Sequence, residues 1–452
     1  MNLTLKEIAG AASGKLKGDA SKVVTRITTD TRALKPGDFY VALKGPKFDG
    51  HDFIAEAKAK GALGAVVSQK VSGSTDFAVV EVADTLRALG DIAHYWRNKF
   101  SVPVIAVTGS SGKTTTKEML VACLEEWGGL CATSGNLNNL VGVPLTLFNL
   151  KEGDRFAIVE MGMNAFGEIA RLTEIASPTV GLVTNVGSAH LEGVGDLKGV
   201  AKAKGELFEK LGESSIAVIN LDDPYISKMK TAAQKVTFGF SEKAMVRCTG
   251  IEYGEQTMNV EISTVKGRSK FTLPFVGEHQ AKNWLAAYAV CQALGIDPTE
   301  KSLARLKPVK MRGEEIKVRG AIIINDTYNA NPDSMMAALA SLGKKSGRKI
   351  AVLGEMMELG KETKPLHEKV GAFAAKAGVE ILLACGSHAA EMKRGFDGAG
   401  GKTSVVFADQ EKLKKELEKL LTKGDTVLIK GSRASQMEKI IGALCSMPSS
   451  IH

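Results

Sequence analysis

Cysteine is scarce in this chain of 452 residues, and its six cysteines are widely separated along the sequence. No two of them form a Cys-x-x-Cys pair, and a disulfide framework is usual only in shorter chains that are richer in cysteine. The sequence therefore predicts reduced thiols and a cytoplasmic protein. The cysteines stand at positions 123, 131, 248, 291, 385 and 445.

Long apolar runs are also missing. No stretch approaches the roughly 18 consecutive apolar residues that a membrane-spanning helix requires. The first residues, Met1–Asp19, lack the charged-then-apolar order of a secretory signal and indicate an amphipathic helix followed by a turn. We therefore expect no membrane span and no secretory signal.

Aromatic residues make up only 6% of the chain, and lysine and arginine form no dense stripe with interleaved aromatics. Such a stripe is what a nucleic-acid-binding surface would require, so we expect no nucleic acid partner. The net charge is nevertheless +9, which suits smaller anionic ligands such as nucleotides without identifying one.

The length exceeds what one hydrophobic core usually organises, and composition shifts divide the chain into three blocks. In residues 100–308 and 309–452, short apolar runs alternate with helical stretches, which predicts parallel sheets covered by helices on both faces. Residues 244–275 have a hairpin-like pattern instead. The predicted class is α/β, with a small N-terminal α/β domain at 1–99, a central P-loop-type parallel-sheet ATPase domain and a C-terminal Rossmann-like α/β domain. We expect a monomer.

The strongest local motif lies at residues 104–116, where an apolar strand runs into a Gly-x-x-Gly-Lys-Thr loop and then a helix. Glycines let backbone N–H groups converge on phosphate oxygens, and the helix N-terminus adds its positive dipole end. The longer phosphate-binding pattern would have glycine where Val107 stands. A flexible turn with a chance lysine is the alternative, but the flanking strand and helix favour a nucleoside triphosphate site. Its predicted residues are Gly109, Ser110, Ser111, Gly112, Lys113, Thr114 and Thr115.

Polar residues follow several strands of the same block, where ligands of an open parallel sheet gather. Glu160 ends one predicted strand, and His190 follows another. With the Thr114 hydroxyl they could hold magnesium against the triphosphate. Alternatively, Glu160 caps a helix and His190 is an ordinary loop histidine. Lys204 follows at the start of a helix; a cation there would repel magnesium, so it could instead bind phosphate or solvent.

These motifs together resemble the Mur ligases over nearly the whole chain. The loop is shared with folylpolyglutamate synthetases, whereas other motifs are more specific. They are Asp30-Thr31-Arg32, Asp49-Gly50-His51-Asp52-Phe53, Gly135-Asn136-Leu137-Asn138-Asn139, Glu160-Met161-Gly162, Thr184-Asn185-Val186-Gly187, Asp326-Thr327-Tyr328-Asn329-Ala330-Asn331-Pro332, Leu353-Gly354-Glu355-Met356, Glu358-Leu359-Gly360 and Lys430-Gly431-Ser432-Arg433.

The resemblance implies an ATP- and magnesium-dependent ligase that works through an acyl phosphate. The stretch from Tyr328 to Pro332 points to the family member that adds D-alanyl-D-alanine to UDP-N-acetylmuramoyl tripeptide. The Asp-Asn-Pro-Arg signature of the member that adds the third residue is missing. The sequence leaves open whether the third residue of the acceptor peptide is lysine or diaminopimelate.

The resemblance also assigns roles to single residues. Lys113 and Thr114 would hold the triphosphate, Glu160 and His190 would help to hold magnesium, and Lys204 would be carbamylated. On the ATP side it adds Asn283, Arg312 and Asp326, with Gln280 where the family usually has asparagine. The residues assigned to the two substrates are Thr31, Arg32, Gly45, His51, Asn138, Asn139, Tyr328, Asn329 and Asn331.

Two other functions remain open at this point. One is a related ligase with a different acceptor, either the third-residue-adding enzyme or a glutamate ligase. The other is a non-catalytic P-loop protein that uses ATP as a switch. Dependence of the reaction on D-alanyl-D-alanine would distinguish the dipeptide-adding enzyme from a related ligase. ATP binding without an amide product would identify the non-catalytic switch. For an enzyme, we expect the third block to rotate onto the second when ATP binds.

Overall fold

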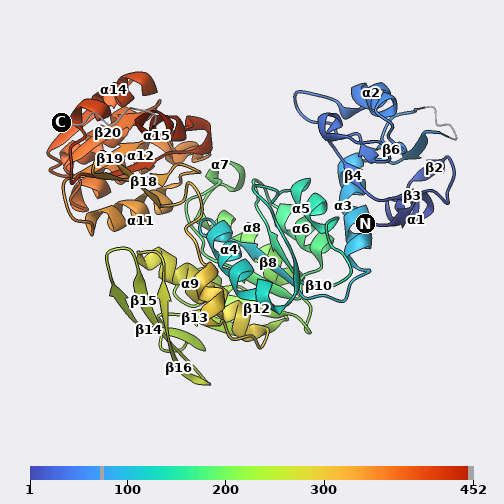
Figure 1. Ribbon diagram of the computed structural model, residues 1–452, viewed down its shortest axis with the longest axis horizontal. Coiled ribbons are helices and arrows are strands. Elements are labelled where there is room, and N and C mark those ends of the chain that lie inside the picture. The colour runs from blue at the N-terminus through green and yellow to red at the C-terminus, as the bar shows by residue number, and fades with distance from the viewer. Residues whose placement is uncertain (72–75, 446–452) are drawn as a thin grey trace.

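The computed structural model describes residues 1–71 and 76–445. Three separate sheets follow one another along the chain, with five, nine and six strands, together with a two-stranded ribbon near the N-terminus (Figure 1). The predicted α/β class and the division into three parts are confirmed. None of the described helices is long and apolar enough to cross a membrane. The last residues of the predicted third block, 446–452, lie outside the described residues.

The N-terminal sheet has the order β2-β7-β6-β5-β4, and only its edge strand β2 is antiparallel to its neighbour. Its strands are short, and Phe39, Val41 and Val66 are fully buried in one apolar cluster that also includes residues of the first helix. The strands are β1 (Leu3–Thr4), β2 (Lys15–Lys17), β3 (Val23–Val24), β4 (Ile27–Thr28), β5 (Phe39–Val41), β6 (Gly64–Val67) and β7 (Ala78–Glu81). The helices are α1 (Leu5–Ala11), α2 (Ile54–Ala59) and α3 (Thr85–Arg97).

Helix α3 joins the N-terminal part to the middle part. Asp84 caps its N-terminus by accepting from the N–H groups of Leu86 and Arg87. At the other end, Trp96 Nε1 donates to Leu150 O at 3.1 Å and the buried Arg97 Nε donates to Ala176 O at 2.8 Å. These bonds tie the helix directly to the middle part just before the next sheet begins.

The middle sheet places the phosphate loop at its centre. Strand β8 lies between β10 and β11, and parallel pairing continues from β9 at one edge as far as β14. The strands are β8 (Val104–Thr108), β9 (Gly129–Ala132), β10 (Asp154–Glu160), β11 (Val180–Val183), β12 (Ile216–Asn220), β13 (Gln234–Gly239), β14 (Val246–Tyr253), β15 (Met258–Thr264) and β16 (Gly267–Leu273).

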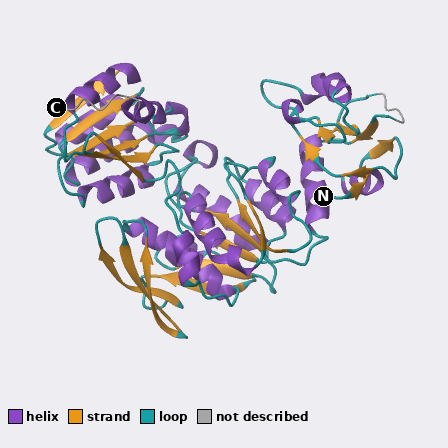
Figure 2. Ribbon diagram, in the orientation of Figure 1, coloured by secondary structure: helices purple, strands orange, loops and turns teal. Residues whose placement is uncertain are grey.

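The hairpin-like pattern predicted at 244–275 corresponds to β14, β15 and β16, which pair antiparallel. Figure 2 shows these strands extending beyond the helices of the middle part. The helices of this part are α4 (Lys113–Leu124), α5 (Gly142–Leu147), α6 (Glu168–Ala176), α7 (Leu191–Val194), α8 (Leu197–Lys210), α9 (Glu278–Ala293) and α10 (Glu300–Arg305).

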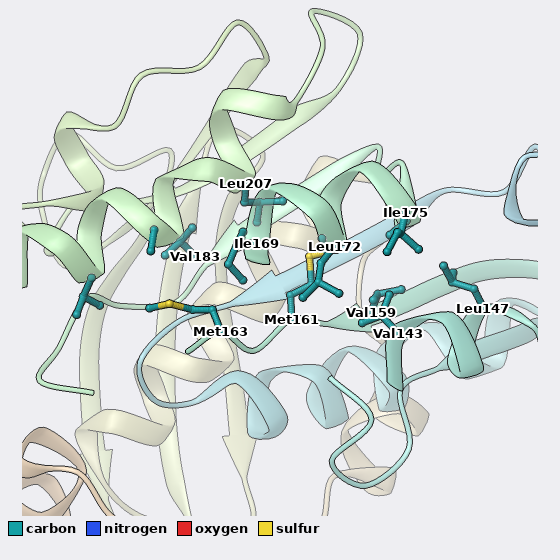
Figure 3. Packing of buried hydrophobic residues seen from close by; sticks show 14 of the residues in the cluster. Val143, Leu147, Val159, Met161, Met163, Ile169, Leu172, Ile175, Val183 and Leu207 are labelled. Atoms are coloured by element: carbon teal, nitrogen blue, oxygen red, sulfur yellow. The ribbon is translucent and has the colours of Figure 1, made fainter. Parts of the chain in front are cut away.

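Apolar side chains fill the space between one face of this sheet and its covering helices (Figure 3). Val159 and Met161 come from β10 and its end, while Leu172 comes from α6 and Leu207 from α8; all four are fully buried. Burying a side chain of this size contributes about 1.5–3 kcal/mol. This packing holds β10, and therefore Glu160 at its end, at a fixed place beside β8.

The C-terminal sheet has the order β17-β18-β22-β19-β20-β21, in which only β17 is antiparallel to its neighbour. Helices cover it on both sides (Figure 2). Its strands are β17 (Glu314–Val318), β18 (Ala321–Asp326), β19 (Lys349–Leu353), β20 (Ile381–Cys385), β21 (Thr403–Phe407) and β22 (Thr426–Lys430). Its helices are α11 (Pro332–Gly343), α12 (Thr363–Lys376), α13 (Ala389–Gly398), α14 (Gln410–Leu420) and α15 (Glu438–Cys445).

None of the five cysteines with described side chains forms a disulfide, and reduced thiols stay a prediction. Cys123, Cys131, Cys248, Cys291 and Cys385 are buried and free. The side chain of Cys445 lies outside the description.

Candidate active site

A cavity of about 1450 Å³ lies where the middle and C-terminal parts meet. The carboxyl ends of the parallel strands open towards it, as expected for an open α/β sheet. Most of the residues predicted from sequence for the nucleotide, its metal and the substrates line this cavity. They are Ser110, Ser111, Gly112, Lys113, Thr114, Thr115, Asn138, Asn139, Glu160, His190, Asn283, Arg312, Asp326, Tyr328, Asn329 and Asn331.

The phosphate loop needs its two glycines for space as well as for conformation. Gly109 and Gly112 have φ values of +152° and +78°. A Cβ atom on Gly109 would lie 1.8 Å from Thr184 Oγ1, and one on Gly112 would lie 2.3 Å from Asn283 Oδ1. The close approach to Gly112 also places Asn283, predicted for the adenine side, directly against the loop. Gln280, where the family usually has asparagine, accepts from Asn283 Nδ2 at 3.3 Å.

A neighbouring strand end holds the loop in place. Ser110 N donates to Asn185 O and Ser111 N donates to Asn185 Oδ1, both at 3.0 Å. Thr184 Oγ1 donates to Ser111 O at 2.7 Å. Helix α4 begins at Lys113, so the N–H groups of its first turn have no partner within the helix. Those groups and the helix dipole favour an anion at this point.

Lys113 reaches back over the loop, and its Nζ donates to Gly109 O at 2.7 Å. Burial lowers the pKa of this ammonium, the Glu160 carboxylate opposes the shift, and the Arg312 charge adds to it. A polyphosphate would supply the negative charge that this site lacks.

Glu160 is 2% exposed at the end of β10. Its Oε1 accepts from Asn138 Nδ2 at 2.8 Å, and its backbone N–H donates to Thr133 Oγ1 at 3.0 Å. The second carboxylate oxygen, Oε2, is buried and has no hydrogen-bonding partner in the described part of the chain. An unpartnered buried carboxylate oxygen beside a phosphate loop fits a hard cation, which prefers oxygen ligands.

Lys204 lies on α8 and is 1% exposed. Among the described residues, no hydrogen bond or ion pair satisfies its ammonium. Burial first, and then the charge of Lys113, hold its pKa well below the ordinary lysine value. An unpaired buried ammonium is costly, so the environment favours the neutral amine.

The C-terminal part contributes its own polar residues to the cavity. Arg312 stacks on the Tyr328 ring, with the guanidinium carbon 4.0 Å from the ring centroid. Asp326 forms an ion pair of 2.7 Å with Lys430. Asn331 Nδ2 donates to Ser110 O at 3.2 Å, which brings the segment 326–332 against the phosphate loop.

The residues predicted for the first block lie elsewhere. Thr31, Arg32, Gly45 and His51 belong to the N-terminal part and do not line this cavity. The His51 ring is held within that part, with Nδ1 2.5 Å from Asp49 Oδ1 and Nε2 accepting from Ser68 N at 2.9 Å. Arg32 forms an ion pair of 2.7 Å with Asp30 and is otherwise exposed. Their assignment to a substrate stays a prediction.

Sequence reasoning missed three residues of this region. Lys430 lines the cavity, is almost fully buried and donates to Asn329 O at 2.9 Å. Asp333 Oδ2 accepts from Ser188 N at 2.6 Å, and Glu358 Oε2 lies 2.6 Å from His190 Nδ1. Lys430 and Glu358 stand within motifs quoted above, but sequence spacing does not show what they contact.

The arrangement brings a polyphosphate site, a buried carboxylate and a group of polar side chains from a second sheet into one cavity. Such a site can hold a nucleoside triphosphate with its terminal phosphate towards a second ligand. It offers cations and N–H groups where charge would build up during phosphoryl transfer. Within residues 1–71 and 76–445, no group of three or more His, Cys, Asp or Glu side chains could hold a metal ion. A metal here would therefore also need oxygens from the nucleotide.

Comparison with known families gives three matches along the chain. The Mur ligase family catalytic domain matches residues 23–97, the Mur ligase middle domain matches 107–291, and the Mur ligase glutamate ligase domain matches 311–433.

Among curated proteins, the UDP-N-acetylmuramoyl-tripeptide–D-alanyl-D-alanine ligase of Escherichia coli K12 is 38% identical over 455 aligned positions, which cover 98% of each chain. The ligase of the same name from Bacillus subtilis 168 is 34% identical and covers 98% of this chain and 99% of its own.

Solved structures of MurF are also similar to this chain over nearly its full length. A crystal structure of MurF from Acinetobacter baumannii superposes with a TM-score of 0.92 at 33% identity, covering 99% of both chains. MurF from Thermotoga maritima in complex with ADP has a TM-score of 0.85 at 32% identity, covering 93% of this chain and 97% of its own.

Proposed function

The chain belongs to the Mur ligase family, and from this premise we propose that it joins D-alanyl-D-alanine to UDP-N-acetylmuramoyl tripeptide at the expense of ATP. This is an ATP-dependent step of peptidoglycan precursor synthesis. The observation that carries the proposal is similarity over the full chain to ligases named for this reaction. The cavity supports it, because a phosphate loop there faces the Tyr328–Asn331 segment.

The chemistry proceeds in two steps. The terminal carboxylate of the tripeptide attacks the γ-phosphorus of ATP, giving an acyl phosphate and ADP. The amine of D-alanyl-D-alanine then attacks the acyl carbon, and the tetrahedral intermediate collapses to the amide with release of phosphate and a proton. Both steps need positioning and charge stabilisation more than covalent help from the enzyme.

Residues of the phosphate loop would bind the nucleotide. The N–H groups at the start of α4 and the Lys113 ammonium would bind the phosphates, and Asn283, which lies against Gly112, would contact the adenine side. Arg312 and Asp326 would reach the nucleotide from the C-terminal part. The known complex of a related MurF with ADP supports nucleotide binding in this fold.

Magnesium would be held by Thr114 and Glu160, with His190 as a further ligand by family resemblance. The buried, unpartnered Oε2 of Glu160 supports this assignment. The ion would neutralise charge on the phosphate oxygens.

Lys204 would carry a carbamate, formed when its neutral amine attacks carbon dioxide and loses a proton. Its burial, the lack of a partner and its lowered pKa all favour the neutral, nucleophilic amine. The product carries a negative charge where the ammonium would be an unpaired cation.

Substrate binding is assigned by part. Residues 1–99 would bind the UDP precursor through Thr31, Arg32, Gly45 and His51, residues 100–308 would bind ATP, and residues 309–452 would bind the dipeptide. In the last part, Tyr328, Asn329 and Asn331 would face the incoming dipeptide, while Asn138 and Asn139 of the middle part would contact a substrate. These boundaries, the monomeric state, the cytoplasmic location and the lack of a nucleic acid partner stay predictions.

The decisive experiment measures phosphate release with magnesium, ATP, UDP-N-acetylmuramoyl tripeptide and D-alanyl-D-alanine, and identifies the product by mass spectrometry. We expect release to require all three substrates and to yield the pentapeptide. Product formed with a single amino acid in place of the dipeptide would instead identify a related ligase. No amide under any combination would favour the ATP-switch alternative. Comparing lysine-containing and diaminopimelate-containing acceptors in the same assay determines the preferred third residue.

A further inference from the structure

The segment 187–192 lies between the phosphate loop and the C-terminal part. On one side, Ser110 Oγ donates to Gly187 O at 3.0 Å. On the other side, Asp333 Oδ2 accepts from Ser188 N at 2.6 Å, and a Cβ atom at position 187 would lie 2.3 Å from that same oxygen. The segment is thus held at its beginning by both parts of the molecule.

Its other end is held by the turn that contains Glu358. Glu192 N donates to Glu358 O at 3.1 Å. Glu358 Oε2 lies 2.6 Å from His190 Nδ1, an ion-pair contact whose angles are not those of a hydrogen bond. Gly360 approaches the Glu192 backbone closely, since a Cβ atom there would lie 3.5 Å from Glu192 Cα. In Figure 1, α7, which follows His190 directly, lies next to the C-terminal part.

The backbones at both ends of this contact are unusual. His190 has a φ of +59° and Glu358 a φ of +62°, a left-handed conformation that side-chain-bearing residues rarely adopt. Such conformations persist where surrounding contacts determine them, and they are frequent at functional sites. Here two of them meet across the junction of two sheets through their side chains, and Glu192, two positions after His190, donates its backbone N–H to Glu358 O.

The two side chains differ in their relation to the cavity. His190 lines it, whereas Glu358 does not. Glu358 therefore touches the ring from outside the cavity, at one of its two nitrogens. A carboxylate this close to one ring nitrogen can accept a hydrogen bond from it after a small rotation of the ring, which would orient the imidazole and leave the other nitrogen available.

We propose that Glu358 is a positioning residue that orients the His190 ring when the C-terminal part is docked on the middle part. Docking of the C-terminal part thereby has two effects on the cavity. It places the segment 326–332 against the phosphate loop, and it fixes the orientation of the His190 ring. The inference rests on the proposed function, since its main readout is turnover.

The test compares Glu358→Gln, which removes the charge at constant shape, with the matched control Glu362→Gln. Glu362 is exposed four positions later in the chain, and its side chain has no hydrogen bond or ion pair in the described structure. We expect Glu358→Gln to lower kcat at least tenfold while KM for ATP changes less than twofold, and Glu362→Gln to behave as wild type. Turnover by the wild-type protein tests the proposed function separately.

Two further measurements show how Glu358 acts. With a non-hydrolysable ATP analogue and the UDP precursor bound, nitrogen resonances of the His190 ring should shift in Glu358→Gln and stay unchanged in Glu362→Gln. The solution-scattering profile of this complex should be the same in all three proteins. A kcat within twofold of wild type would overturn the proposal. So would unchanged His190 resonances, or an altered scattering profile, which would show that Glu358 only holds the two parts together.

Discussion

Arg312 and Thr114 are 198 positions apart in the sequence, yet Arg312 Nη2 donates to Thr114 Oγ1 at 3.0 Å. The arginine lies in the C-terminal part, just before β17, and the threonine is in the first turn of the phosphate-loop helix. Because the same guanidinium stacks on Tyr328, it joins the predicted dipeptide segment to the predicted nucleotide site. In the ligase we propose, Arg312 would therefore interact with both the ATP site and the dipeptide site.

The Arg312→Ala variant should therefore lose kcat/KM for ATP by about 10²–10³-fold, the usual effect of removing one group that stabilises phosphoryl charge. Arg312→Lys should recover only part of this, because lysine keeps the charge but not the planar stacking group. Steady-state kinetics at varied ATP measures both. Lys317→Ala, on the exposed face of β17, serves as the control, and equal activity of Arg312→Ala and this control would contradict the prediction.

Removal of the Lys113 side chain should abolish turnover. Lys113 is the cation that the phosphate loop holds in place, and losing it where phosphoryl oxygens become more negative should cost about 3–4 kcal/mol of transition-state stabilisation. Phosphate release by Lys113→Ala would be compared with that of Lys198→Ala, an exposed lysine on α8. Near-normal phosphate release by Lys113→Ala would contradict the assignment of this loop to phosphate binding.

The carbamate at Lys204 predicts chemical rescue. Lys204→Ala should lose most activity and regain part of it when short carboxylic acids such as acetate are added, because a free carboxylate can replace the missing anion. Lys202→Ala, an exposed neighbour on the same helix, should stay active and show no response to acetate. Full activity of Lys204→Ala without additive would show that the residue is dispensable.

Lys204 should also destabilise the protein when it carries no carbamate. In carbon dioxide-depleted buffer, Lys204→Met should raise the free energy of unfolding at pH 7 by on the order of 1–4 kcal/mol, the range seen when apolar residues replace buried charges. Because the pKa of Lys204 is lowered in the folded state, the unmodified lysine costs folding free energy. That cost is full below the folded pKa and disappears as the pH rises to the ordinary lysine pKa. The advantage of the methionine variant should therefore shrink as pH rises towards the ordinary lysine pKa. Thermal unfolding at pH 7 and pH 9.5 tests this, and a lower melting temperature for the variant at pH 7 would contradict it.

The junction of α1 and α3 should respond to acid. Glu7 accepts from Lys99 Nζ at 2.7 Å and from the Tyr95 hydroxyl at 3.1 Å. The Lys99 hydrogen bond is the main cause that lowers the pKa of Glu7 from 4.5 to about 2. Its stabilisation is present above pH 4.5 and is lost as the pH falls towards 2.

A Glu7→Gln variant should accordingly be less stable than wild type at pH 7, by no more than about 1 kcal/mol because the pair is partly exposed. The difference in stability between wild type and Glu7→Gln should become smaller when the pH is lowered from 5.5 to 3.5. Melting temperatures of the first unfolding transition across this range measure it. A difference that stayed constant with pH would show that the Glu7 charge is not the cause.

Much of the fold follows from local pattern. The alternation of apolar runs and helical stretches predicted in residues 100–308 and 309–452 corresponds to the parallel strands of the middle and C-terminal sheets, β8 and β12 among them. Not every strand of the middle sheet has such an apolar run. Strand β13 has exposed polar residues at its start, Gln234 and Lys235, so its sequence lacks the continuous apolar run by which buried parallel strands are recognised.

By itself, the sequence determined the phosphate loop, the α/β class and the family, because these depend on residues that are close together in the chain. The tertiary structure decided which distant groups meet: Arg312 with Thr114, and Glu358 with His190. It also decided that Lys204 is buried without a partner. Local spacing cannot determine these relationships, because each one depends on how separately folded sheets and their helices pack against one another.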